Sequence, residues 1–166
     1  MLLGTALIVI LAALFGARHY ATHLLAERDR DDTLAPINSL LAENKRLLTE
    51  LDKEGLAQGG ELRLTAFLSL IRKDGVPGQA ANQRRIDTLV NNNTSITALL
   101  FRYSPRARTA DFRMAAEKYR EYAQTLRDRW QSVFATFMAG GNLAGSDPAT
   151  PTELKVALEA ESAQLP

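Results

Sequence analysis

Residues 110–139, ADFRMAAEKYREYAQTLRDRWQSVFATFMA, predict a long helix with one aromatic face. The large apolar side chains recur at intervals of three and four residues, which places them on one side of an α-helix. Because the charged residues take the other side, we expect the rings to pack in a core and not to stack on nucleic-acid bases. The stripe consists of Phe112, Ala115, Tyr119, Tyr122, Leu126, Trp130, Val133, Phe134 and Phe137.

Further helices are predicted on both sides of this one, so the fold class is an all-α antiparallel bundle. We expect Asp31-Asp32-Thr33 to break the chain before a helix that starts near Pro36 and runs to about Lys53. The wide apolar stripe of that helix favours a bundle over a dimeric coiled coil, although Asn44 falls at a heptad a position. Further helices are predicted over residues 80–103 and from the capping box Thr150-Pro151-Thr152-Glu153 to about residue 163.

Two segments leave alternatives open. Residues 62–65 alternate like a strand, whereas the apolar residues from Leu64 to Ile71 follow helical spacing. We interpret residues 61–73 as helix, because we find no second strand candidate to pair with them. Residues 91–95, NNNTS, are poor helix formers that either interrupt the helix over 80–103 or place Asn93 in the core.

The first seventeen residues, MLLGTALIVILAALFGA, carry no charge and one side-chain hydroxyl. As a helix they would span about 25 Å, close to the roughly 30 Å of a bilayer's hydrocarbon core. Tyr20 suits the interface, and Arg18 can reach the headgroups. We expect a single transmembrane helix, with anchoring carried by Leu7, Ile10, Leu14, Arg18 and Tyr20.

A cleaved signal peptide and a buried core helix are the alternatives for this segment. No basic residue precedes Arg18, and bulky Phe15 lies two residues before a possible cut after Ala17, which disfavours a signal peptide. The absence of a polar face in the sequence disfavours a core helix. We therefore predict an anchor over residues 1–20, a juxtamembrane extension over 21–33, a bundle over 34–140, and a flexible link with a short helix over 141–166.

The basic residues near the span follow it and do not precede it. The positive-inside rule counts Arg18, Arg28 and Arg30, so it predicts an external N-terminus and a helical domain on the cytoplasmic side of the cell's inner membrane. The periplasm is the alternative location for the domain.

The sequence shows no pattern of catalytic, cofactor-binding or metal-binding residues. It contains no cysteine, and its two histidines, His19 and His23, have no evident third ligand. It has no phosphate-binding glycine motif or nucleophile elbow. The net charge of +1 gives no overall field for nucleic acid. We predict a non-enzyme without cofactor, metal or small-molecule substrate.

A protein partner is the expected ligand. Residues 84–129 hold ten basic and five acidic residues, and the best candidates for a polar contact surface are Arg106, Arg108, Arg113 and Arg120. Small residues in the predicted span, such as Ala12 and Gly16, would allow another transmembrane helix to approach. The sequence therefore predicts a membrane-anchored accessory or scaffold subunit that also contacts lipid.

Two other functions fit the same layout. One is a sensory or ligand-binding helical bundle. The other rests on the order of a short apolar segment, helical segments and a long helix preceded by Ser104-Pro105-Arg106, which resembles the layout of the inner-membrane spanins of tailed phages. That resemblance implies a lysis factor with its bulk in the periplasm, and it does not extend to residues 142–166.

Burial of the aromatic stripe is testable at its largest side chain. We expect Trp130→Ala to lower the free energy of unfolding by about 3–5 kcal/mol, because a buried ring leaves a cavity when it is removed. Chemical denaturation measures this loss, and an almost unchanged midpoint would place Trp130 on the surface.

Overall fold

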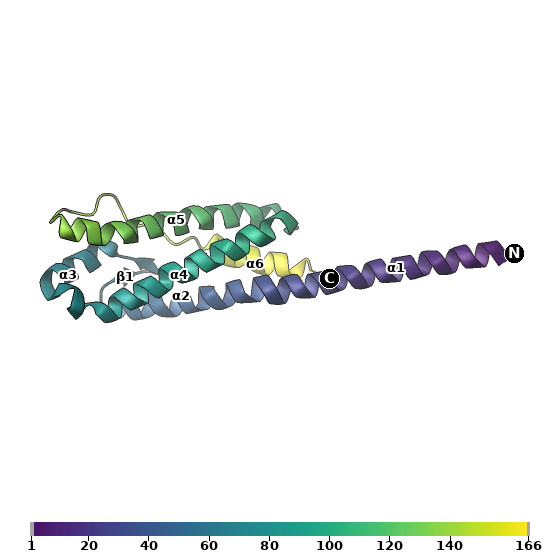
Figure 1. The fold of residues 1–166 in the computed structure, drawn as a ribbon, viewed down its shortest axis with the longest axis horizontal. Coiled ribbons are helices and arrows are strands. Elements are labelled where there is room, and N and C mark those ends of the chain that lie inside the picture. Colours follow the sequence, from purple (N-terminus) through teal and green to yellow (C-terminus); the bar gives the residue numbers. More distant parts are fainter. Residues whose placement is uncertain (1, 166) are drawn as a thin grey trace.

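A computed structural model describes the backbone of residues 2–165 and the side chains of residues 15–165. The described chain is mostly helical, which confirms the all-α prediction (Figure 1). Its helices are α1 (Leu2–Asp29), the π-helical turn η1 (Arg30–Leu34), α2 (Ala35–Lys53), α3 (Leu64–Gly78), α4 (Ala80–Tyr103), the 3-10 turn η2 (Ser104–Arg106), α5 (Ala110–Met138) and α6 (Glu153–Ala163).

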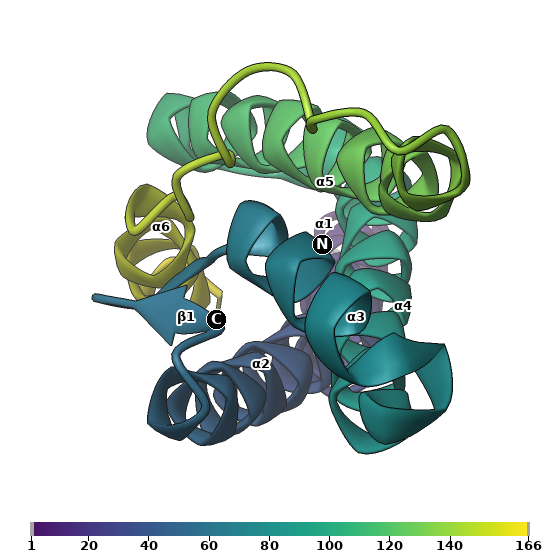
Figure 2. The same ribbon diagram turned by 90° about the vertical axis from the view of Figure 1, so that its left-hand side faces the viewer.

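The helices form a bundle with α1 projecting from one end. Helices α2, α4 and α5 run antiparallel in chain order, with α3 at the end far from the N-terminus and α6 beside α5 (Figures 1 and 2). Buried apolar side chains from all five bundle helices join in one core. The predicted helical bundle is therefore confirmed.

The predicted break at Asp31-Asp32-Thr33 is wrong, because the chain remains helical from α1 into α2. Pro36 lacks a backbone N–H and its ring crowds the carbonyl four residues earlier, which a regular α-helix does not tolerate well. The widened turn η1 accommodates it, with the Ala35 N–H bonded to the Arg30 carbonyl five residues back.

Residues 61–73 form both a short strand and most of a helix, the two alternatives considered from the sequence. Strands β1 (Ala57–Gln58) and β2 (Glu61–Leu62) pair antiparallel, with Ala57 opposite Leu62. Gly59 and Gly60 join them at φ values of 60° and 86°, as a type I′ turn requires. Helix α3 begins at Leu64 and kinks at Gly75, whose φ of 75° is not helical. The helical interpretation of residues 61 and 62 was wrong. Their partner, β1, is only two residues long, so it leaves no strand pattern in the sequence.

Helix α4 spans the predicted range without a break at residues 91–95, and Asn93 is buried. Thr109 begins α5 by accepting a hydrogen bond from the Phe112 N–H at 3.2 Å. Most of the aromatic stripe is buried, with Phe134 and Phe137 partly exposed. Trp130 contacts the rings of Phe67 and Phe134, both with centroids at 5.3 Å.

The link after α5 is joined to the bundle by a partly buried ion pair. Arg129 and Asp147 pair at 2.9 Å with side chains only 12% and 15% exposed. The second Asp147 oxygen accepts the backbone N–H of Leu64 at 3.1 Å, so this carboxylate caps α3 from a distant part of the chain.

The predicted capping box of α6 is not formed. Its N-cap is Thr152, which makes no side-chain capping bond. The Thr150 hydroxyl instead bonds the Gly60 carbonyl oxygen at 3.0 Å, because the β1–β2 turn lies against this part of the link.

Glu161 fastens α6 to the α4–α5 connection. It is fully buried and accepts hydrogen bonds from the Tyr103 hydroxyl, the N–H groups of Arg108 and Thr109, and the Thr109 hydroxyl, at 2.7–2.9 Å. Burial raises the pKa of this carboxyl, but the hydrogen bonds outweigh burial and the net pKa is below the ordinary value of 4.5. The negative charge also lies at the positive end of α5.

The hydrogen-bonded carboxylate of Glu161 makes the free energy of unfolding depend on pH. A lowered folded-state pKa means that its contribution is fully present above about pH 4.5 and is lost as pH falls through the folded-state pKa. We expect Glu161→Gln to lower the free energy of unfolding at pH 7 by about 3 kcal/mol and to flatten its dependence on pH in the acid range. Denaturation from pH 2 to pH 7 measures both, with Glu159→Gln on the exposed side of α6 as the control. Equal profiles for the two variants would refute this role.

Candidate functional site

A cavity of about 630 Å³ lies beside α2 in the part of the bundle away from α1. Its walls come from α2, α4, α5, the start of α6 and the turn between β1 and β2, and its volume is in the range of small-molecule sites. The lining residues are Leu41, Asn44, Lys45, Leu48, Thr49, Asp52, Gly59, Gly60, Glu61, Leu89, Asn93, Tyr119, Tyr122, Thr150, Pro151, Thr152, Leu154 and Lys155.

Aliphatic side chains make up much of the wall. Leu89 and Leu154 are fully or almost fully buried, and Leu48 is nearly so. Leu41 is partly buried and packs against the core. Leu41 therefore offers nonpolar surface to any molecule that enters, while Leu89 and Leu154 lie behind it in the core.

A network of neutral polar side chains crosses the bundle at the same level. The Asn44 amide donates to the Asn93 side-chain oxygen at 2.9 Å, and the Tyr119 hydroxyl donates to the same oxygen. Asn92 completes the network by donating to the Asn44 side-chain oxygen at 3.0 Å. The network therefore joins α2, α4 and α5 through one amide oxygen.

The orientation of the Asn93 amide follows from these contacts. Its oxygen faces two donors, so the two ends of the amide cannot be exchanged without losing both bonds. Its nitrogen is the one buried side-chain nitrogen or oxygen, among the residues with described side chains, that lacks a hydrogen-bond partner. A buried donor without an acceptor is costly and calls for an explanation.

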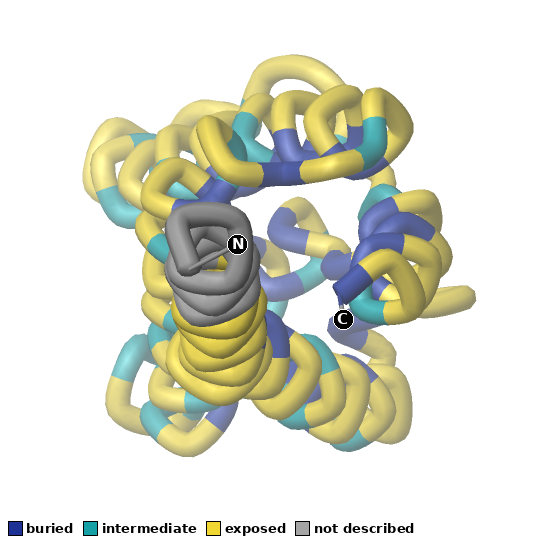
Figure 3. Tube along the Cα trace, turned by 90° about the vertical axis from the view of Figure 1, so that its right-hand side faces the viewer, coloured by how far each residue is buried: buried dark blue, intermediate teal, exposed yellow. Residues whose placement is uncertain are grey.

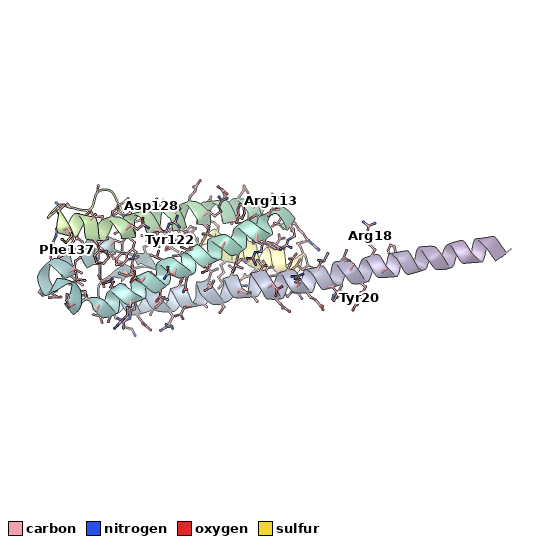
Figure 4. All side chains as sticks on the ribbon, viewed as in Figure 1. Arg18, Tyr20, Arg113, Tyr122, Asp128 and Phe137 are labelled. Carbon is pink, nitrogen blue, oxygen red and sulfur yellow. The ribbon has the colours of Figure 1, made fainter. Side chains whose placement is uncertain are left out.

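Two neighbouring hydroxyl groups also lie at the cavity wall, near α6. The Thr150 and Tyr122 hydroxyl oxygens are 3.2 Å apart, and Figure 4 shows Tyr122 on the inner side of α5. Burial raises the pKa of the Tyr122 hydroxyl, an effect partly offset by the hydrogen bond from Thr150. Burial likewise raises the pKa of Tyr119 well above its ordinary value. Both hydroxyls therefore stay protonated and neutral near pH 7.

The charged lining residues are all exposed and lie at the mouth of the cavity. They are of both signs: Lys45 and Lys155 are basic, and Asp52 and Glu61 are acidic. The buried lining residues carry no formal charge, so the cavity is neutral inside with a mixed charged mouth.

The anchoring residues predicted from the sequence lie elsewhere. Arg18 and Tyr20 are exposed on the projecting part of α1, as Figure 4 shows. The side chains of Leu7, Ile10 and Leu14 lie outside the described residues. Within the described part of the chain, no helix is both long and apolar enough to cross a membrane.

The four arginines proposed as a partner surface are each engaged within the chain. Arg106 pairs with Asp29 at 3.0 Å, linking η2 to the end of α1. The Arg108 guanidinium donates to the Gln164 carbonyl, and that of Arg113 donates to the Ala107 carbonyl at 2.9 Å. Arg120 pairs with Glu117 on its own helix at 2.7 Å. The partner surface itself stays a prediction.

No protein-family model, curated protein or solved structure matches the chain. In the described residues, no group of three or more histidine, cysteine or acidic side chains is placed to hold a metal ion.

The cavity was missed in the sequence because its walls come from five separate segments. Two signals pointed toward it. Asn44 occupies a heptad position that is normally apolar, and the residues around Asn93 are unusual in a helix interior. Neither signal shows that the two amides meet, since 49 positions separate them.

The network predicts that substitutions at two neighbouring asparagines change the stability of the fold by different amounts. Asn93→Leu leaves the buried Asn44 amide and Tyr119 hydroxyl without their acceptor, so we expect the free energy of unfolding to fall by about 2–4 kcal/mol. Exposed Asn91 provides the control, and Asn91→Leu should change the value by less than about 0.5 kcal/mol. Urea denaturation compares the two, and equal losses would contradict the network.

Proposed function

We propose that this chain is a membrane-anchored helical accessory subunit whose bundle binds a protein partner in a membrane-associated complex. The uncharged segment of residues 1–17 would form the anchor, and the remainder of helix α1 would connect it to the bundle. We place the anchor in the cell's inner membrane and the bundle on its cytoplasmic side.

The observation that carries this proposal is the exposure of α1 outside the bundle. Every side chain from residue 15 to residue 25 is exposed, as the yellow turns next to the grey end show in Figure 3, and Figure 1 shows α1 projecting from the bundle. Phe15 and Tyr20 are 77% and 67% exposed, and Leu24 and Leu25 are also exposed. A helix surface with this many large apolar groups is typical of contact with lipid or another protein.

The connection between α1 and the bundle is also suited to an anchored domain. Helix α1 continues through η1 into α2, so there is no hinge loop between them. The Arg106–Asp29 pair and buried Ala26 add tertiary contacts where α1 meets the bundle. A partner that binds the bundle would therefore be held at a defined distance from the membrane.

A second candidate function is favoured by the cavity. The bundle could bind a small molecule, as in the sensory or ligand-binding alternative from the sequence. Its supporting observation is the cavity of about 630 Å³, whose buried lining residues carry no formal charge.

Anchoring is tested by carbonate extraction of membranes from cells that express the full chain with a C-terminal tag. We expect the wild type to stay in the membrane pellet and Ile10→Arg to be released, because a charge in the middle of a span costs about 3 kcal/mol. Asn38→Arg, on the exposed side of α2, is the control and should stay in the pellet. Release of the wild type by carbonate would contradict the anchor.

The same tagged chain also tests on which side of the membrane the bundle lies and which protein it binds. Protection of the tag in spheroplasts supports the cytoplasmic location, and digestion supports the periplasmic, spanin-like alternative. Co-purification in mild detergent is expected to recover a membrane-complex subunit that Ile10→Arg no longer recovers.

A further inference from the structure

We infer that His19 and His23 together bind one divalent transition-metal ion of the kind that prefers imidazole nitrogen, such as Zn²⁺. The site lies on the projecting part of α1, between the proposed anchor and the bundle. This inference departs from the expectation, made from the sequence, that the chain holds no metal. It depends neither on membrane anchoring nor on ligand binding in the cavity.

The spacing of the two histidines is the first argument. They are four residues apart in an unbroken part of α1, so they are neighbours on one face of the helix. The Cβ atoms of such a pair lie about 5–6 Å apart, which lets both rings reach one ion with Zn–N bonds of about 2.0–2.1 Å. Zinc metalloproteases use two histidines at the same spacing on a helix. The pair can therefore chelate an ion without a change in the backbone.

Both rings are accessible because this part of α1 lies outside the bundle (Figure 1). His19 and His23 are exposed, and the side chain of His23 keeps 48% of its surface open to solvent. Figure 4 shows the side chains of Arg18 and Tyr20, the sequence neighbours of His19, projecting from the same free stretch of helix. An ion can therefore reach the ring nitrogens without displacing a packed group.

The carboxylate of Glu27 is the second argument, since it lies beside one of the two rings. Its Oε1 is 3.4 Å from Nδ1 of His23, one helical turn away. A carboxylate in this position favours the tautomer with the proton on Nδ1, which leaves Nε2 free to bind a metal ion. Histidine ligands in protein metal sites are usually oriented by such a carboxylate. Glu27 therefore prepares His23 as a ligand and adds a negative charge near the ion.

The distribution of charge around α1 also favours a cation on this face. Between residues 15 and 27, Arg18 is the one basic residue besides the histidines, and Glu27 is the one acidic residue. At about 100° per residue, Arg18 lies about 140° around the helix from His23, whereas Glu27 lies only about 40° from it. The guanidinium is therefore on a different side of α1 from His23, and the carboxylate is on the same side.

The two imidazoles select the class of ion. Imidazole nitrogen suits Zn²⁺, Cu²⁺ and Ni²⁺, whereas Mg²⁺ and Ca²⁺ are bound by oxygen ligands. Two histidines fill half of a tetrahedral zinc sphere, so two positions remain for water. Such a site is distinct from a cluster of three or more ligands, which the described residues do not form.

Competition with a Zn²⁺-sensitive dye tests the inference on the full chain, purified without a polyhistidine tag. Dodecyl maltoside keeps the apolar N-terminal segment in solution whether or not it spans a membrane, and detergent alone is the blank. We expect one Zn²⁺ per chain. His19→Ala and His23→Ala should each weaken binding at least ~10-fold, because one imidazole lacks the advantage of chelation. Glu27→Gln should weaken it less, since it removes only the orienting carboxylate.

A spacing variant provides the matched control. Ala21→His combined with His23→Ala keeps two histidines but places them two residues apart, about 200° around the helix, where one ion cannot reach both. This double variant should bind Zn²⁺ no better than His23→Ala. All of these positions are exposed except Ala26 and the bundle beyond it, which no variant changes, so the unfolding midpoint should stay the same.

Two results would contradict the inference. A wild-type affinity no higher than that of the spacing variant would overturn the site, because Zn²⁺ would then bind single side chains. Equal affinities for the wild type and Glu27→Gln would overturn the part assigned to Glu27. Neither result bears on carbonate extraction, which tests the anchor by itself.

Discussion

The side-chain oxygen of Asn93 determines how the three long bundle helices lie against one another. It accepts from Asn44 on α2 and from Tyr119 on α5, while its own backbone belongs to α4. A slip of any helix by one turn, about 5.4 Å, would break these bonds and leave buried polar groups unpaired. The leucine and aromatic contacts around the network tolerate such a shift better, so the amide specifies the register.

Two carboxylates extend this order to the rest of the bundle. Asp147 joins the link after α5 to the first residue of α3, and Glu161 joins α6 to the two residues that precede α5. Each accepts backbone N–H groups at the start of a helix from a distant part of the chain. Together they hold the link and α6 in place, and thereby form the side of the cavity that carries Thr150 and Leu154.

The regular spacing of apolar residues, together with the residues that begin or end helices, predicted much of this fold. The spacing of apolar residues predicted the bounds of α4, and the aromatic stripe predicted those of α5 nearly to the residue. Local signals failed where distant groups decide the conformation. Thr150 was expected to cap α6 but bonds Gly60, and Pro36 was expected to start a new helix but is accommodated by a π turn. The cavity depends on contacts between residues far apart in sequence, which periodicity alone does not show.

A crystal structure of the purified chain tests the central role of Asn93 most directly. The account predicts that the Asn44 amide and the Tyr119 hydroxyl both bond the Asn93 side-chain oxygen, at donor–acceptor distances of about 2.5–3.2 Å. An Asn93 oxygen that neither of these groups bonds, with Asn44 and Tyr119 paired elsewhere, would contradict it.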